Sequence, residues 1–265
     1  MSEPSSKPPE GTPQSGANPF TDTPAPWMNM KSQVFSTVAR AKGIPEGSYA
    51  ELEAQSPFAD QDASGQYRGL VCSVMIVRYF ETPVDPYDEI LFVPGHFDVP
   101  DKGIKRPRVT RIYVSSKESV YNGRKNWNIP KHLANFKFIP SDKSSAIPYA
   151  GVEISLPSTP DQPFVTLDFS PVTILSKPSF PFSTSYVPID MGLWAPALPE
   201  SKDWKENGLV GTQEWRQARA DISGWARVIR VKGKLGDGQA FPDLKLGGLW
   251  VYINDARVSF VTVEA

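Results

Sequence analysis

Residues 108–138 carry the clearest structural pattern in this chain and read RVTRIYVSSKESVYNGRKNWNIPKHLANFKF. Ser115-Ser116-Lys117-Glu118 has the form of a capping box, in which the Ser115 hydroxyl accepts from the backbone N–H of residue 118. Val120, Arg124 and Trp127 then share one helix face, and Asn128 with Pro130 ends the helix. We therefore expect a strand from Arg111, a helix, a tight turn and a second strand reaching Phe138, with Lys131 just after the turn.

On both sides of this unit the sequence favours β-structure. Seven runs rich in β-branched and aromatic residues are separated by Pro, Gly, Asp and Ser. These runs are Leu70–Phe80, Tyr87–Pro94, Val109–Val114, Val152–Leu156, Phe164–Phe169, Trp225–Val231 and Leu249–Val263. Many strands with few helices predict one mostly β (α+β) domain over residues 27–265, with a sandwiched or closed antiparallel sheet.

The region before these strands is predicted differently. Val34, Val38 and Ala41 have helical spacing, so a short helix is expected from Trp27 to Ala41, followed by a loop over residues 46–66. Residues 1–26 hold many prolines and serines and few large apolar side chains, which predicts a disordered tail. Within it, Asn18-Pro19-Phe20 resembles the short motifs that dock into endocytic adaptor domains, although three residues often match by chance.

Composition excludes several classes of protein. The 265 residues include 28 basic and 29 acidic side chains, and this balance argues against a dedicated nucleic-acid binder. The longest apolar run, residues 69–77, is too short to span a membrane, and no apolar segment of a secretory signal is visible. With two histidines and the single Cys72, which we expect to be a buried thiol, a His/Cys zinc site is close to excluded. We expect a cytoplasmic protein that interacts with neither nucleic acid nor membrane.

Charge gathers in residues 101–131, which contain nine Lys or Arg against Asp101 and Glu118. One interpretation is a solvated face with its flanking loops. The alternative is an electropositive approach that concentrates an anionic small molecule.

The motif around Lys131 resembles the acetoacetate decarboxylase-like superfamily. In that family a helix ends in a Gly-Arg-Glu-like turn that is followed by an aromatic residue and Pro-Lys-Lys. Here the same register gives Gly123-Arg124-Lys125, then Trp127, then Pro130-Lys131-His132. Upstream, Tyr87-Asp88-Glu89 matches the start of the family strand that contributes a cavity carboxylate. The resemblance covers roughly residues 68–140 and implies a cone-like antiparallel β-barrel around a small-molecule cavity.

The resemblance also implies roles for individual residues. Lys131 matches the lysine that forms the Schiff base, and Glu89 matches the cavity glutamate that orients the substrate. Arg124 matches the helix-end arginine, with a positioning role. Together with Arg124, three further residues are expected to line the substrate site: His132, Tyr87 and Trp127. The family arginine that faces the substrate carboxylate has no clear counterpart, and Arg68 and Arg78 are weak substitutes.

His132 departs from the family pattern, because the decarboxylases carry a second lysine there that is credited with lowering the pKa of the first. A lysine with the ordinary pKa of about 10.4 is neutral in only about one molecule in 2,500 at pH 7. Burial alone can lower a lysine pKa by about 3–5. Desolvation in an apolar interior is therefore expected to suffice without a neighbouring cation.

The expected function is a lysine Schiff-base lyase acting on a β-keto acid or a related carbonyl compound, with no metal or organic cofactor. Two alternatives stay open from the sequence. The same imine could serve aldol, retro-aldol or dehydration chemistry, or the barrel could bind a small metabolite without catalysis. Relatives of this kind also form homo-oligomers, but no interface is legible in the sequence.

Overall fold

The computed structural model describes residues 18–142, 144–172, 179–186, 192–245 and 247–262. Strands dominate these residues. They are β1 (Trp27–Arg40), β2 (Tyr67–Gly69), β3 (Val71–Glu81), β4 (Tyr87–Val93), β5 (His96–Val99), β6 (Ile104–Pro107), β7 (Arg111–Val114), β8 (Lys131–Leu133), β9 (Asn135–Pro140), β10 (Tyr149–Ser155), β11 (Val165–Pro171), β12 (Phe180–Ser183), β13 (Leu193–Ala195), β14 (Arg216–Leu235) and β15 (Leu249–Thr262).

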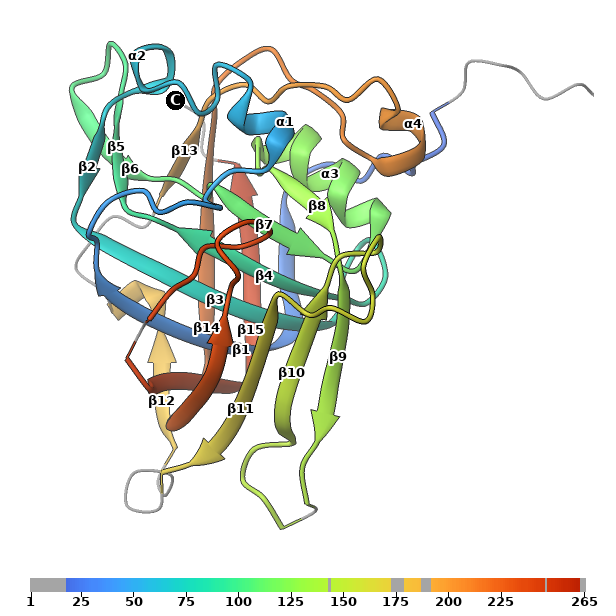
Figure 1. Ribbon diagram of the computed structural model, residues 1–265, viewed down its shortest axis with the longest axis vertical. Coiled ribbons are helices and arrows are strands. Elements are labelled where there is room, and N and C mark those ends of the chain that lie inside the picture. The colour runs from blue at the N-terminus through green and yellow to red at the C-terminus, as the bar shows by residue number, and fades with distance from the viewer. Residues whose placement is uncertain (1–17, 143, 173–178, 187–191, 246, 263–265) are drawn as a thin grey trace, which may run out of the picture.

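Helices are few, and the α-helices gather near one end of the molecule, away from the far ends of β10 and β11 (Figure 1). They are α1 (Glu51–Ala54), α2 (Gln61–Ser64), α3 (Lys117–Trp127), α4 (Trp204–Asn207) and the 3₁₀ turn η1 (Thr184–Tyr186). None of the helices in the described part of the chain has the length and apolar character needed to cross a membrane.

One large sheet of twelve strands organises the domain. Its hydrogen-bonded path runs β8-β7-β4-β3-β1-β15-β14-β11-β10-β9, and β12 and β13 also pair with β14. A second, smaller sheet has the order β2-β5-β6. The prediction of a mostly β domain is confirmed, and each of the seven predicted strands overlaps an observed one, with ends that differ by a few residues.

Two details of the predicted sheet need correction. The pairing is not wholly antiparallel, because β7 and β8 run parallel, with Ile112 opposite Lys131. A parallel neighbour needs a crossover connection, and α3 provides it. In addition, β8 and β9 stand at opposite ends of the path and are not paired in the described residues, so the predicted closed, cone-like barrel is not found.

The sheet buries a separate apolar core on each of its faces. In β4, Ile90 and Phe92 belong to one core, whereas Tyr87 belongs to the other, which also receives Val120 and Trp127 from α3. Successive strand residues point to opposite faces, so a single strand supplies both cores. We call the face covered by α3 the helix face and the other the interior face.

The predicted helix over Trp27–Ala41 is wrong, because the segment forms strand β1. It pairs with β15 on one side and β3 on the other. Bulges between Trp27 and Met30 and between Ser32 and Val34 interrupt the alternation of buried and exposed residues. Because the bulges interrupt the alternation, the sequence of this segment lacks the period-2 pattern of a strand. The i, i+4 spacing of Val34 and Val38 then resembles that of a helix.

Two boundaries also differ from expectation. The predicted loop over residues 46–66 contains the short helices α1 and α2. The cap of α3 lies one residue later than predicted, because the Ser116 side chain accepts from the backbone N–H of Ser119. Ser115 instead accepts from the N–H of Asp88, and Glu118 accepts from the N–H of Thr21, so the reciprocal capping box is absent.

Only part of the predicted disordered tail, residues 1–26, lies within the described residues. Residues 1–17 lie outside the described part of the chain, and disorder there stays a prediction. Residues 18–26 run along α3. The Asn122 side chain bonds both the carbonyl of Thr21 and the N–H of Thr23. Phe20 is buried and stacks on Tyr121 with ring centroids 5.1 Å apart. In this conformation the phenyl ring of the Asn18-Pro19-Phe20 motif is therefore covered.

Candidate active site

Strand pairing and the end of α3 together place Lys131 beside Glu89. Asn128 caps the C-terminus of α3 in the left-handed conformation, with φ of 53°, which turns the chain back toward the sheet. Lys131 then aligns with Ile112 of β7, and β7 in turn pairs with β4, where Val114 faces Glu89. Residues 42 positions apart in the sequence thus meet on the helix face.

The Lys131 amine is buried in a ring of oxygen atoms. Its side chain is 5% exposed and that of Glu89 6%. Nζ donates to Glu89 Oε2 at 2.9 Å, to Ser119 Oγ at 3.0 Å and to the Tyr87 hydroxyl at 3.4 Å. The amine also lies 5.0 Å from the centre of the Tyr87 ring. Strand β4 and helix α3 therefore supply all of its side-chain partners.

The pKa of Lys131 is raised, whereas the sequence analysis expected burial to lower it. Burial is the largest influence and lowers the pKa, as expected for an ammonium taken out of water. The charge of Glu89, with smaller contributions from Tyr87 and the hydrogen bonds of both, outweighs it, so the pKa lies above the ordinary value. In this structure the amine is an ammonium held by a carboxylate, and desolvation alone does not make it neutral.

Gly123 lets α3 lie directly on the lysine stem. A Cβ at this position would come 2.5 Å from Cδ of Lys131 and 2.7 Å from its Cε. Such distances are far inside van der Waals contact, so with any larger residue here the lysine stem or the helix would have to shift. The glycine of the Gly-Arg motif thus has a direct packing reason.

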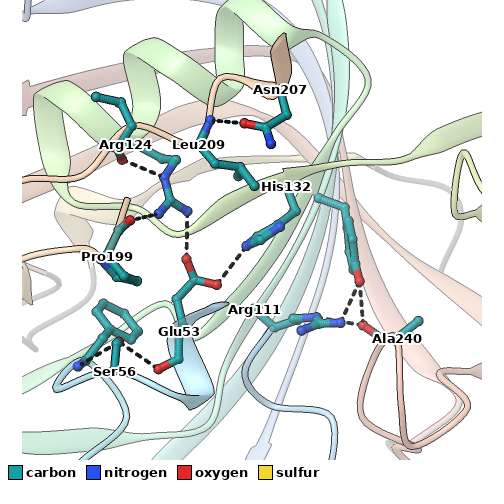
Figure 2. Close-up of polar contacts among 12 residues, drawn as sticks. Glu53, Ser56, Arg111, Arg124, His132, Pro199, Asn207, Leu209 and Ala240 are labelled. Atoms are coloured by element: carbon teal, nitrogen blue, oxygen red, sulfur yellow. Dashed lines mark hydrogen bonds and ion pairs between the residues drawn. The ribbon is translucent and has the colours of Figure 1, made fainter. Parts of the chain in front are cut away.

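A second buried cluster lies around Glu53 (Figure 2). Glu53 Oε1 accepts from Nη1 of Arg124 at 2.7 Å, and its Oε2 is 2.7 Å from Nε2 of His132. The side chains of Glu53 and Arg124 are completely buried. The other guanidinium nitrogens of Arg124 donate to the carbonyls of Pro199 and Val210. All three nitrogens are therefore occupied by the protein itself.

Neighbouring charges keep the Glu53 carboxylate ionised. Burial raises the pKa of Glu53, but His132 and Arg124 together outweigh it, and the pKa lies below the ordinary value. Burial also lowers the pKa of Arg124, with Glu53 opposing it. His132 faces away from Lys131, because successive residues of β8 point to opposite sides of the sheet, and its ring lies 6.5 Å from that of Tyr113 on the interior face.

The sequence-predicted residues thus fall into separate places. Lys131, Glu89 and Tyr87 come together. Arg124 and His132 meet only through Glu53. Trp127 is 2% exposed and packs edge-on against Trp27 at 5.0 Å, in the core of the helix face.

Neither substitute arginine lies at the lysine. Arg68 pairs with Asp98, and Arg78 pairs with Asp88 while its guanidinium sits 4.7 Å from the centre of the Phe138 ring.

Two residues of these clusters were missed from the sequence. Ser119 lies one helical turn before Gly123, on the face that meets the sheet, and this spacing was available as a signal. Glu53 lies in a segment read as loop and has no pattern of its own. Only the fold brings it to Arg124, 71 positions later in the chain.

The basic stretch is not a single solvated face. Four of its nine cations are buried: Arg108, Arg111, Arg124 and Lys131. Arg108 is representative, with its guanidinium 4.3 Å from the centre of the Phe97 ring and hydrogen bonds to Ser64. Burial lowers the pKa of Arg108 to about 10. Within the described residues, no group of three or more His, Cys, Asp or Glu side chains is placed to hold a metal ion.

Comparisons with known proteins reveal similarity in fold. Neither a scan against protein-family models nor a search of curated sequences finds a match. Among solved structures, an acetoacetate decarboxylase aligns with a TM-score of 0.56 at 13% identity, covering 95% of this chain and 91% of that one. The acetoacetate decarboxylase from Legionella pneumophila aligns with a TM-score of 0.54 at 13% identity, covering 98% of both chains.

A third similar structure is the enduracididine biosynthesis enzyme MppR, complexed with the condensation product of pyruvate and imidazole 4-carboxaldehyde. It aligns with a TM-score of 0.53 at 14% identity and covers 97% of this chain and 96% of that one. These structural neighbours are enzymes. Because the alignments span nearly the whole of each chain, the protein shares its fold with acetoacetate decarboxylase and MppR.

Proposed function

We propose that this protein is a lysine Schiff-base enzyme that acts on a β-keto acid or a related small carbonyl compound. The observation that carries the proposal is the buried Lys131 amine, 2.9 Å from the Glu89 carboxylate, at the position that the family motif gives to the Schiff-base lysine. The fold of acetoacetate decarboxylases along nearly the whole chain supports it.

The first chemical step is removal of a proton from the amine. An ammonium has no lone pair, and the pKa of Lys131 is raised by its contact with Glu89. Glu89 Oε2 already accepts a hydrogen bond from Nζ, so the proton can pass along that bond. The transfer turns a buried ion pair into two neutral groups, and relief of the desolvation cost offsets part of the lost attraction between the two charges. Glu89 is therefore the internal base that prepares the nucleophile.

The remaining steps follow from imine chemistry. The neutral amine adds to the keto carbon, and loss of water gives an imine, which is then protonated. Cleavage of the bond to the carboxylate carbon releases CO₂, and its electron pair moves into the iminium to form an enamine. Protonation of the enamine carbon and hydrolysis return the ketone and free Lys131. Ser119 and Tyr87 are within hydrogen-bond reach of the nitrogen and can hold its geometry through these steps.

A second candidate is condensation or dehydration of carbonyl compounds through the same imine. It is favoured by the MppR structure, which contains a condensation product of pyruvate and an aldehyde. The third candidate is a binding protein in which Lys131 only neutralises Glu89, and the raised pKa of Lys131 favours that reading.

Borohydride trapping tests these candidates. The protein is incubated with a panel of keto acids and aldehydes, reduced, and examined by mass spectrometry for a covalent adduct on the peptide that contains Lys131. We expect an adduct in the wild type and none in Lys131→Ala. The control is Lys137→Ala, which removes an exposed lysine that pairs with Glu153 and should still give the adduct. CO₂ release with adduct formation indicates the decarboxylase, and adducts without CO₂ indicate the condensing enzyme. If a broad panel gives no adduct with the wild type, the Schiff-base proposal is wrong.

A further inference from the structure

The structure contains a cavity that the lysine chemistry does not use. Its volume is about 470 Å³, which lies within the range of small-molecule sites. Its lining includes Ala39 of β1, Cys72 of β3, Phe92 of β4 and Leu244 of the loop before β15. Cys72 and Phe92 are buried members of the core on the interior face, with Ala39 and Leu244 packed against it. The inner part of this cavity is therefore apolar.

The mouth of the cavity is positively charged. Arg40, Lys42 and Lys245 line it, against the single carboxylate of Asp243. All four side chains are exposed, and none of the three cations forms an ion pair within the described residues. Converging cations at the edge of an apolar hollow attract an anion and leave its apolar part to enter the hollow.

We propose that this cavity binds a carboxylate that carries a short apolar chain, such as a medium-chain fatty acid. The chain would lie against Phe92, Cys72 and Leu244, and the carboxylate would stay at the mouth beside Lys42 and Lys245. The charge of the mouth opposes an organic cation of the same length. Burial of the chain and attraction of the head group act at opposite ends of one ligand, so each can be tested separately.

This site lies apart from the lysine. In β4, Phe92 points to the interior face, whereas Glu89, an odd number of residues away, points to the helix face. The inference therefore does not depend on the proposed function. Lys131→Ala should bind the ligand as the wild type does, and the cavity can be occupied whether or not Lys131 forms an imine.

Cys72 provides a direct reporter, because it is the only cysteine in the chain and lines the cavity. Octanoate is the first probe, and alkylation of Cys72 by iodoacetamide is followed by mass spectrometry at increasing octanoate concentration. We expect saturable protection of the thiol. Across hexanoate, octanoate and decanoate the apparent affinity should rise about fourfold for each added methylene until the cavity is full. Octylammonium should protect far less.

Rim variants identify the head-group contacts. Lys42→Gln/Lys245→Gln should weaken octanoate at least about fivefold at low ionic strength, since each exposed charge contributes modestly. The control is Lys117→Gln/Lys202→Gln, which removes two exposed charges that do not line the cavity and should bind as the wild type does. The proposal is overturned by absence of saturable protection up to decanoate, by equal protection from octylammonium, or by undiminished binding in the rim variant.

Discussion

Two buried charge clusters flank the same short strand, and they are built in opposite ways. On one side of β8, Arg124 donates from all three guanidinium nitrogens, to Glu53 and to the carbonyls of Pro199 and Val210. On the other side, the Lys131 amine contacts only the side chains of Glu89, Ser119 and Tyr87.

This difference separates a structural cation from the one that we propose to be reactive. The guanidinium joins α3 to three distant segments of backbone and side chain, and its planar, permanently charged group suits that role. The amine is bound by groups that can exchange protons with it, and a lysine can become neutral where an arginine cannot. The partners of a buried cation, rather than its burial, indicate which cluster can do chemistry.

The largest effect on stability is expected at Glu53. Glu53→Leu leaves the Arg124 guanidinium buried without its carboxylate, and loss of one partner from a buried pair costs about 3–5 kcal/mol. Urea unfolding of the variant and the wild type measures the difference. As a control, Glu51→Leu changes an exposed carboxylate in the same short helix and should cost less than about 0.5 kcal/mol. A loss at Glu53 no larger than that of the control would contradict the structural role of this cluster.

A smaller loss of stability is expected at Lys131, and a second substitution at Glu89 should restore most of it. Lys131→Met leaves Glu89 with hydroxyl donors nearby, and we expect a loss of about 2–3 kcal/mol. The double variant Lys131→Met/Glu89→Leu replaces the pair with apolar groups and should return to within about 1 kcal/mol of the wild type.

The matching double variant at the other cluster, Glu53→Leu/Arg124→Met, should not recover. It leaves the carbonyls of Pro199 and Val210 without their donor as well as removing the ion pair. Equal recovery of the two double variants in urea unfolding would show that the clusters do not differ in the way described.

The sequence predicted the centre of this region better than its surroundings. The α3 unit was predictable because a capping serine, a periodic apolar face, Asn128 and Pro130 all lie within a short stretch. The resemblance carried by the Gly-Arg and Pro-Lys motif and by Tyr87-Asp88-Glu89 pointed to Lys131 and Glu89, and the structure brings these two side chains together. Their chemical roles stay a proposal.

The remaining features depend on contacts between distant segments. The role of Glu53 could not be predicted from its neighbours in the sequence, because nothing around it requires a buried carboxylate. Strand β1 was mistaken for a helix because its bulges hide the alternation that pairing with β3 and β15 imposes. The raised pKa of Lys131 depends on a distance of 2.9 Å to Glu89, which no spacing rule provides.

The close approach of α3 to the lysine predicts an intermediate effect at Gly123. Gly123→Ala improves helix propensity by about 1 kcal/mol, but its Cβ must displace the lysine stem, and overpacking costs about 1–3 kcal/mol. We expect a net loss of about 0–2 kcal/mol and slower borohydride trapping at Lys131. Lys117→Ala, on the exposed side of α3, is the control and should change neither. Unchanged trapping in Gly123→Ala would show that the stem moves freely.

The smallest effects concern pH, and they have opposite signs in the two clusters. The folded-state pKa of Glu53 lies below its ordinary value of 4.5, so its contribution to stability is present above that pH and is lost as pH falls through the folded pKa. The folded-state pKa of Lys131 lies above its ordinary value of 10.5, so its contribution is complete below that pH and is lost only as pH rises through the folded pKa.

Free energies of unfolding measured from acid to alkaline pH should therefore show two separate losses of stability. Glu53→Leu should flatten the acid side of the profile and leave the alkaline side unchanged, and Lys131→Met should do the reverse. If Lys131→Met instead changed the profile near neutral pH, the amine would lose its proton there and the Glu89 contact would not hold the ammonium. The trapping rate of the wild type should likewise rise with pH toward the alkaline limit, because more of the lysine is then neutral and able to attack a carbonyl.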